Sequence, residues 1–156
     1  HEDFLNHIDI LPENIHIPDG TVPEARISEY CASYDHSVRK IDLMIIGVGE
    51  DGQIGFNEPG AAFESETHCV DLAESTIEAN QRFFERREDV PRQAYTMGIK
   101  TIMQAKKILI VASGEDKAEI VHKAFFGPIT PQVPASVLQL HNDVTLVADE
   151  AALSCL

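Results

Sequence analysis

Short apolar runs rich in β-branched residues alternate along this chain with segments of helical period, and this alternation limits the fold to few classes. Residues 41–48 (IDLMIIGV) are almost continuously apolar, which is typical of a central strand buried on both faces. Residues 107–112 (KILIVA) and 144–148 (VTLVA) are similar runs. The pattern predicts an α/β protein with an open, mostly parallel sheet covered by helices.

The segments around these runs carry helical signals. Residues 23–40 begin with a proline suited to a first turn and then repeat apolar residues at three- and four-residue spacing. We also expect helices at residues 72–84, 97–105, 115–126, 134–140 and 149–156. The sequence shows no internal repeat and no long linker, so residues 1–156 are expected to form one domain.

The charge balance excludes some classes of partner. Twelve basic residues against 26 acidic ones give a formal charge of −14, and this field repels nucleic acids and anionic membrane surfaces. Cys31, Cys69 and Cys155 are odd in number and widely spaced, which predicts reduced thiols and a cytoplasmic location. The sequence contains no metal-type CxxC or HxxxH spacing and no apolar run of about 20 residues, so we expect neither a metal site nor a membrane span.

A glycine-rich, acidic loop at residues 49–60 (GEDGQIGFNEPG) follows the first predicted strand. Ligands of open α/β sheets bind at the carboxyl ends of strands, so this loop is a candidate binding or catalytic site. Its glycines permit close approach of a ligand, and Asp51, Gln53 and Glu58 supply groups that bond or carry protons. Pro59 biases Glu58 to an extended backbone, which makes a stiff corner. The alternative is a mobile acidic surface turn.

Two cations are candidates for binding an anionic substrate. Lys117 lies in the first turn of a predicted helix after Ser113 and Gly114, where helix-start amides and a lysine can bind an anion; the alternative is a solvated side chain. Arg82, in ANQRFF, either clamps a phosphate or stacks on a neighbouring phenylalanine. His141, in LQLH, is expected to complete a helix end rather than to act in catalysis.

Four stretches together resemble the glucosamine-6-phosphate deaminases: LMIIGVGEDGQIGFNEPG, THCVDLAESTIEANQRFF, VPRQAYTMGIKTIMQAKKILIVASGEDKAEIV and PASVLQLHNDVTLVAD. The resemblance runs over essentially the whole chain in the expected order. It implies conversion of glucosamine 6-phosphate and water to fructose 6-phosphate and ammonia, with no metal or organic cofactor. It also implies a small-molecule sugar-phosphate partner and a monomer or a hexamer.

The resemblance implies a role for each candidate residue. Asp51 would take part in ring opening, the residue at position 53 would exchange a proton with the ring oxygen, and Glu58 would support that residue. Arg82, in its RFF context, and Lys117, in its SGxxKA context, would contact the substrate phosphate.

The chain departs from the family pattern DGHIGFNEP at Gln53, where the family has histidine. A carboxamide does not titrate near neutral pH, and losing an acid/base group typically lowers a rate about a hundred- to ten-thousand-fold. The family's opening segment, with a glycine-rich phosphate loop and a catalytic aspartate, is expected before His1. We therefore expect a fold incomplete at its amino terminus, with exposed core faces and poor solubility.

Other functions stay open at this point. A 6-phosphogluconolactonase has a related fold and a similar loop, although FNEP and ANQRFF favour the deaminase. Gln53 also suits a non-catalytic sugar-phosphate-binding or regulatory protein. Some relatives bind an allosteric activator through basic residues after the NEP corner, but the matching stretch AAFESETHCV is acidic, which argues against that regulation. The sequence does not decide between glucosamine and galactosamine 6-phosphate.

Overall fold

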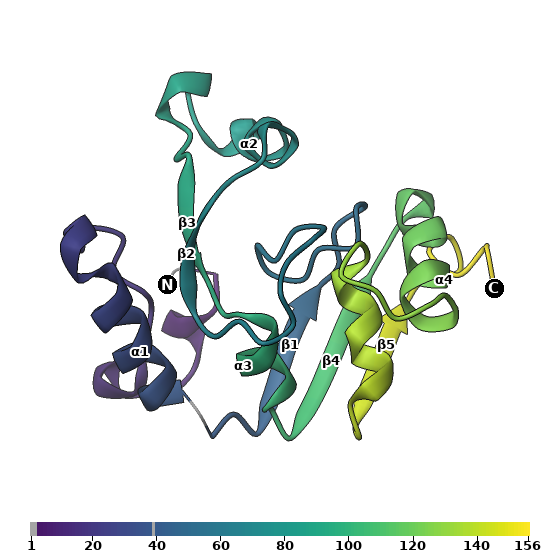
Figure 1. The fold of residues 1–156 in the computed structure, drawn as a ribbon, viewed down its shortest axis with the longest axis horizontal. Coiled ribbons are helices and arrows are strands. Elements are labelled where there is room, and N and C mark those ends of the chain that lie inside the picture. The colour runs from purple at the N-terminus through teal and green to yellow at the C-terminus, as the bar shows by residue number, and fades with distance from the viewer. Residues whose placement is uncertain (1–2, 39) are drawn as a thin grey trace.

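The computed structural model describes residues 3–38 and 40–156, and a three-stranded parallel sheet lies at its centre. The strands β1 (Leu43–Gly47), β4 (Lys107–Ala112) and β5 (Val144–Ala148) follow one another across the sheet in the order β1-β4-β5 (Figure 1). They coincide with the three predicted strands, and the first begins two residues later than expected. The predicted α/β class with a mostly parallel sheet is confirmed.

Helices cover one face of this sheet and enclose the core. They are α3 (Ile99–Met103), α4 (Ala118–Phe126) and the 3-10 helix η7 (Pro134–Leu140) (Figure 1). The core residues include Met44, Ile108, Ile110 and Ala112 from the strands and Ile99, Ile102, Val121, Ala124 and Leu138 from the helices. In α4 the buried residues recur at spacings of three and four, which is why an amphipathic helix forms there.

The opposite face of the sheet is exposed, which corrects the prediction that residues 41–48 are buried on both faces. Leu43 and Ile45 are 49% and 62% exposed, and Val111 and Val147 are 45% and 50% exposed. Side-chain alternation and the parallel register place all four on the same side. The apolar pattern correctly indicates a strand, but the described segments supply helices to only one side. This face of the sheet is therefore exposed in the part of the chain that the structure describes.

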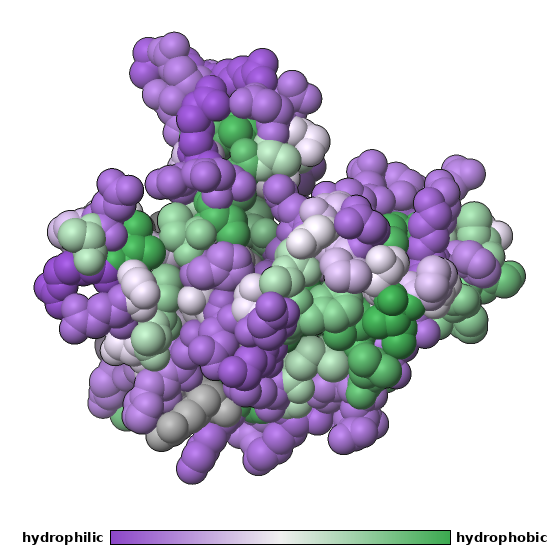
Figure 2. Space-filling model, viewed as in Figure 1, coloured by the Kyte–Doolittle hydropathy of each residue, from purple (hydrophilic) through white to green (hydrophobic). Residues whose placement is uncertain are grey.

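A second sheet, which is antiparallel, was not predicted from the sequence. Its two strands frame a projecting arm, residues 68–96, that rises away from the parallel sheet (Figure 1). The arm consists of β2 (His68–Asp71), α2 (Glu74–Asn80), the 3-10 helices η4 (Gln81–Phe83) and η5 (Arg87–Asp89), and β3 (Gln93–Thr96). The helix expected at residues 72–84 is thus divided into α2 and η4. Figure 2 shows a mostly hydrophilic outer surface on the arm.

The helix α1 (Ile27–Val38) follows the 3-10 helix η3 (Glu24–Arg26), so the helix predicted at residues 23–40 is confirmed in its main part. Asp35 fastens α1 to the segments before β2 and in α3. Its Oδ1 accepts the hydroxyls of Thr67 at 2.6 Å and Thr101 at 2.9 Å. Because both threonines are buried, these bonds hold α1 firmly beside the hairpin.

The remaining elements are short. The 3-10 helices η1 (Leu5–His7), η2 (Pro12–Asn14) and η6 (Glu115–Lys117) lie in connecting segments, and η6 leads into α4, as residues 115–126 predict. Residues 149–156 form a series of turns, which corrects the expected terminal helix. None of the helices in residues 3–38 and 40–156 has the length and apolar character needed to cross a membrane.

Candidate active site

The loop at residues 49–60 leaves β1 at the carboxyl edge of the parallel sheet, where the sequence predicts it. Two of its turns require glycine, because Gly52 has φ +88° and Gly55 has φ +58°. A Cβ on Gly52 would also lie 3.0 Å from Cγ1 of Val133, and one on Gly55 would lie 2.9 Å from the hydroxyl oxygen of Thr96. The glycines therefore serve both the backbone conformation and the close packing of the loop.

Hydrogen bonds hold this loop in a defined conformation. Asp51 Oδ1 accepts the backbone amide of Gln53 at 3.0 Å. Asn57 is buried, and its Nδ2 donates to the carbonyls of Ile54 and Met97, at 2.8 Å in each case. Such bonding indicates an ordered loop rather than a mobile surface turn, and the role of the loop as a binding or catalytic site stays a prediction.

Gln53 lies half-buried in the same loop. Its Oε1 is buried and has no hydrogen-bond partner among the described residues. This oxygen can accept a hydrogen bond, but the amide cannot take up and release a proton near neutral pH as an imidazole does. Gln53 is thus placed to bond a donor, and its chemistry differs from that of the histidine expected at this position.

Glu58 is bound to the arm. Its Oε1 accepts the hydroxyl of Thr76 at 2.7 Å and the backbone amide of Ala73 at 3.2 Å. Within the part of the chain that the structure describes, no hydrogen bond joins this carboxylate to Gln53. The NEP corner does hold the carboxylate in a defined place. Its partner Thr76 was missed by the sequence analysis, since a threonine inside a predicted helix carries no local signal of a distant carboxylate.

Lys117 lies beside the loop. Its Nζ is 3.9 Å from Glu50 Oε1 and 3.6 Å from Asp116 Oδ2, and the side chain is 21% exposed. Because β1 and β4 are neighbours and run parallel, the segments that follow them meet at one edge of the sheet. The structure therefore brings Lys117 next to the loop that carries Asp51.

The turn before Lys117 is bound by a carboxylate from the end of β5. The Gly114 amide lies 3.1 Å from both carboxylate oxygens of Asp149, and the Ser113 hydroxyl donates to Oδ2 at 2.6 Å. The hydrogen bond from Ser113, followed by bonds from backbone amides, holds the pKa of Asp149 below its ordinary value. The Gly114 amide thus binds an internal carboxylate, and anion binding by the other amides of this helix start stays a prediction.

Arg82 lies in η4 on the arm and is exposed. Its guanidinium carbon is 4.8 Å from the centre of the Phe83 ring, so the expected stacking on a phenylalanine is confirmed. A phosphate contact by Arg82 stays a prediction. The arm that carries Arg82 is joined to the loop through Thr76 and Glu58.

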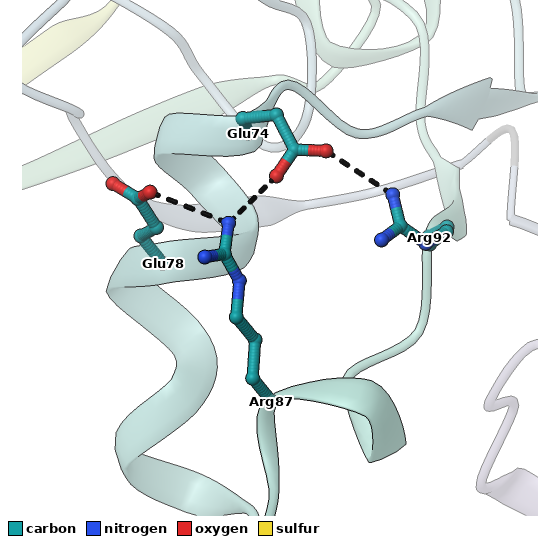
Figure 3. A network of polar contacts seen from close by, with 4 residues as sticks. All are labelled: Glu74, Glu78, Arg87 and Arg92. Carbon is teal, nitrogen blue, oxygen red and sulfur yellow. Dashed lines mark hydrogen bonds and ion pairs between the residues drawn. The ribbon is translucent and has the colours of Figure 1, made fainter.

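A network of ion pairs ties α2 to the segment that leads into β3 (Figure 3). Arg87 Nη2 lies 2.9 Å from Glu74 Oε2 and 3.4 Å from Glu78 Oε1, and Arg92 Nη1 lies 3.1 Å from Glu74 Oε1. Hydrogen bonds from Arg92 and then Arg87 lower the pKa of Glu74 from its ordinary value. All four side chains are more than half exposed, so each pair contributes little to stability but restrains the arm.

The described cavities lie apart from the predicted residues. One of about 640 Å³ is lined by α1 and the β2–β3 hairpin, including Cys31, Cys69 and Tyr95, and one of about 260 Å³ includes Phe56 and Met97. None of the predicted site residues lines these cavities. Among residues 3–38 and 40–156, no group of three or more His, Cys, Asp or Glu side chains could hold a metal ion.

His141 has a structural place, as predicted. It ends η7, its Nε2 lies 2.8 Å from the Ala105 carbonyl, and its Nδ1 accepts the Asp143 amide at 3.0 Å. Both ring nitrogens are therefore engaged by backbone groups.

Comparison with known proteins shows the family to which this chain belongs. A family model described as glucosamine-6-phosphate isomerases/6-phosphogluconolactonase matches residues 1–147, and the chain belongs to this family. A curated glucosamine-6-phosphate deaminase from Clostridioides difficile (strain 630) is 49% identical over 98% of this chain and 62% of its own length. A solved monomeric glucosamine-6-phosphate deaminase is 42% identical, with a TM-score of 0.93 over 99% of this chain and 65% of that chain.

These matches confirm the resemblance to the glucosamine-6-phosphate deaminases. The chain spans less than two thirds of the length of both relatives. A solved 6-phosphogluconolactonase from Thermotoga maritima is only 20% identical, with a TM-score of 0.62 over 89% of this chain and 57% of that chain. That more distant likeness shows a shared fold alone.

Proposed function

We propose that this chain supplies part of a glucosamine-6-phosphate deaminase, which converts glucosamine 6-phosphate and water to fructose 6-phosphate and ammonia. One observation carries the proposal: in a chain 49% identical to such a deaminase, the loop with Asp51 and Glu58 lies at the carboxyl edge of the sheet with Lys117 beside it. We assign no cofactor to the reaction. The free thiols suit a reducing compartment, and we propose the cytoplasm.

Ring opening of the sugar is the step that we assign to this loop. Asp51 is exposed, and the Gln53 amide restrains one of its carboxylate oxygens. An exposed, oriented carboxylate can remove the proton of the anomeric hydroxyl, while the ring oxygen must receive a proton as the ring bond breaks. Gln53 can donate a hydrogen bond to the ring oxygen but cannot transfer the proton itself. The cyclic sugar should therefore open slowly.

Substrate binding is assigned to two cations. A phosphate dianion needs local positive charge in a chain whose formal charge is −14. Lys117 would exchange its contacts with Glu50 and Asp116 for the phosphate, and Arg82 on the arm would supply a second contact. The subsequent proton shift between C1 and C2 needs a further base, and we assign it to the aspartate that the family resemblance places before His1.

Ammonia release from glucosamine 6-phosphate by the complete polypeptide tests the proposal, with Gln53→His beside the unchanged protein. Restoring a titratable group at position 53 is expected to raise kcat about a hundred- to ten-thousand-fold. Gln53→Asn, which keeps an amide, is the matched control and should give no gain. Galactosamine 6-phosphate in the same assay determines the preferred epimer.

The second candidate function is a sugar-phosphate-binding protein without catalysis, and Gln53 is the residue that favours it. Absent ammonia release in both the unchanged protein and Gln53→His, with retained binding of glucosamine 6-phosphate by calorimetry, would establish that alternative. Hydrolysis of 6-phosphogluconolactone in a parallel assay tests the lactonase, whose solved members share the fold at low identity.

A further inference from the structure

A carboxylate of the candidate catalytic loop reaches directly into the arm. Glu58 Oε1 accepts two arm donors, the Thr76 hydroxyl at 2.7 Å and the Ala73 amide at 3.2 Å. Thr76 is only 7% exposed, so little water competes for its hydroxyl. A hydrogen bond from a shielded hydroxyl to an ionised carboxylate belongs to the stronger, charge-assisted class.

Thr76 is itself held by the helix in which it lies. Its backbone carbonyl accepts a hydrogen bond from Asn80 Nδ2 at 2.8 Å, and the adjacent Ile77 is 2% exposed. A threonine in a helix is largely restricted to two χ1 rotamers, so α2 limits the directions in which its hydroxyl can point. The position of the Glu58 carboxylate consequently follows the position of the arm.

We propose that Thr76 is a positioning residue: its hydroxyl fixes the Glu58 carboxylate against α2 and so couples the arm to the loop that carries Asp51. The kinetic consequence rests on the proposed deaminase function, whereas the coupling itself does not. If Glu58 turns toward a ligand at Gln53, it must first release the Thr76 hydroxyl and the Ala73 amide. If the arm moves away from the loop, the same two bonds must break.

Hydrogen exchange measures this coupling independently of activity. In the 156-residue chain, Thr76→Val removes the hydroxyl and keeps the side-chain shape. We expect the amides of residues 72–92 to exchange about tenfold faster, because a lost bond to a charged group shifts a local opening equilibrium by that order. The amides of β4 and α4 should be unaffected. Thr76→Ser restores the hydroxyl and should return the exchange rates of the arm to near the original values.

Two controls separate positioning from general destabilisation. Thr101→Val removes another buried threonine hydroxyl, which donates to Asp35 at 2.9 Å, and should not selectively accelerate exchange in the arm. Glu58→Gln weakens the bond between Glu58 and Thr76 by changing its acceptor. The double variant with Thr76→Val should therefore show amide exchange in the arm no faster than that of either single variant. Additive effects, or arm exchange unchanged in both single variants, would overturn the coupling.

The kinetic consequence is measured with a polypeptide that releases ammonia. Thr76→Val is expected to lower kcat about tenfold while KM changes less than about twofold, and Thr76→Ser should recover most of the loss. A change confined to KM would contradict the assigned role of Thr76. If neither the unchanged protein nor any variant releases ammonia, the proposed function is wrong. The hydrogen-exchange measurement still decides whether Thr76 positions Glu58.

Discussion

Individual side chains of this protein act mainly through partners that lie far away along the chain. Asp149, at the end of β5, accepts the Ser113 hydroxyl and the Gly114 amide from the turn after β4. Both segments follow parallel neighbouring strands, so a carboxylate from one naturally meets amides from the other. This bond fixes the turn from which η6 begins, and η6 places Lys117 beside the loop.

Asp149→Asn is expected to destabilise the fold at neutral pH and to change its acid sensitivity. Folding lowers the pKa of Asp149, so this carboxylate contributes fully to the unfolding free energy above its pKa in the unfolded chain, which is about 3.9. The contribution is lost as the pH falls through the pKa in the folded protein. Urea unfolding at several pH values should show a constant difference in unfolding free energy from pH 7 to about 5, which shrinks below about 4. Glu150→Gln, which removes one negative charge at the neighbouring position, is the control for the change in net charge. A difference independent of pH down to strong acid would contradict the prediction.

At the scale of elements, the arm is held both to the loop and within itself. Thr76 and Ala73 bind Glu58 of the loop, while Arg87 and Arg92 bind α2 to the returning segment within the arm. The ion pairs are exposed and the threonine contact is buried, so the two kinds of restraint should respond differently to salt.

Arg87→Ala is expected to accelerate amide exchange in residues 74–90 about two- to fivefold at low salt, and much less in 0.5 M salt, because exposed ion pairs are weak and screened. Exchange measured by mass spectrometry at both salt concentrations tests this. Arg26→Ala removes an exposed pair with Glu29 outside the arm and serves as the control. Equal acceleration at both salt concentrations would show that Arg87 acts through packing instead.

The whole molecule is asymmetric, with one face of the parallel sheet covered and the other bare. Leu43, Ile45, Val111 and Val147 on the bare face are about half exposed or more, whereas polar residues dominate the surface of the arm (Figure 2). Exposed apolar surface of this extent normally marks a contact region or a cause of aggregation.

The 156-residue chain is therefore expected to bind a hydrophobic dye such as ANS and to self-associate at micromolar concentration. Replacing Ile45 and Val147 together by threonine should reduce both effects with little loss of stability, since these side chains are 62% and 50% exposed. Ile110→Thr, at a position that is 1% exposed, should instead destabilise the fold by about 3 kcal/mol. A chain that stays monomeric and binds no dye would show that the face is covered in solution.

The local pattern of the sequence determined much of this protein. Apolar runs and helical spacing predict β1, β4, β5, α1 and α4, because these signals depend on neighbours a few residues away. The loop after β1 is also local, since its glycines permit the backbone angles that its turns need. The motifs in and after that loop are enough to place the chain in its family.

Only the tertiary structure decided which groups meet. Glu58 and Thr76 are 18 residues apart and Gly114 and Asp149 are 35 apart, so no local pattern pairs them. The β2–β3 hairpin, the turns at the carboxyl end and the bare side of the sheet likewise depend on what packs against each segment. An apolar run specifies that a strand forms, but burial of each face is set by other segments, and that is the physical reason why the sequence predicted β1 but not its exposed side.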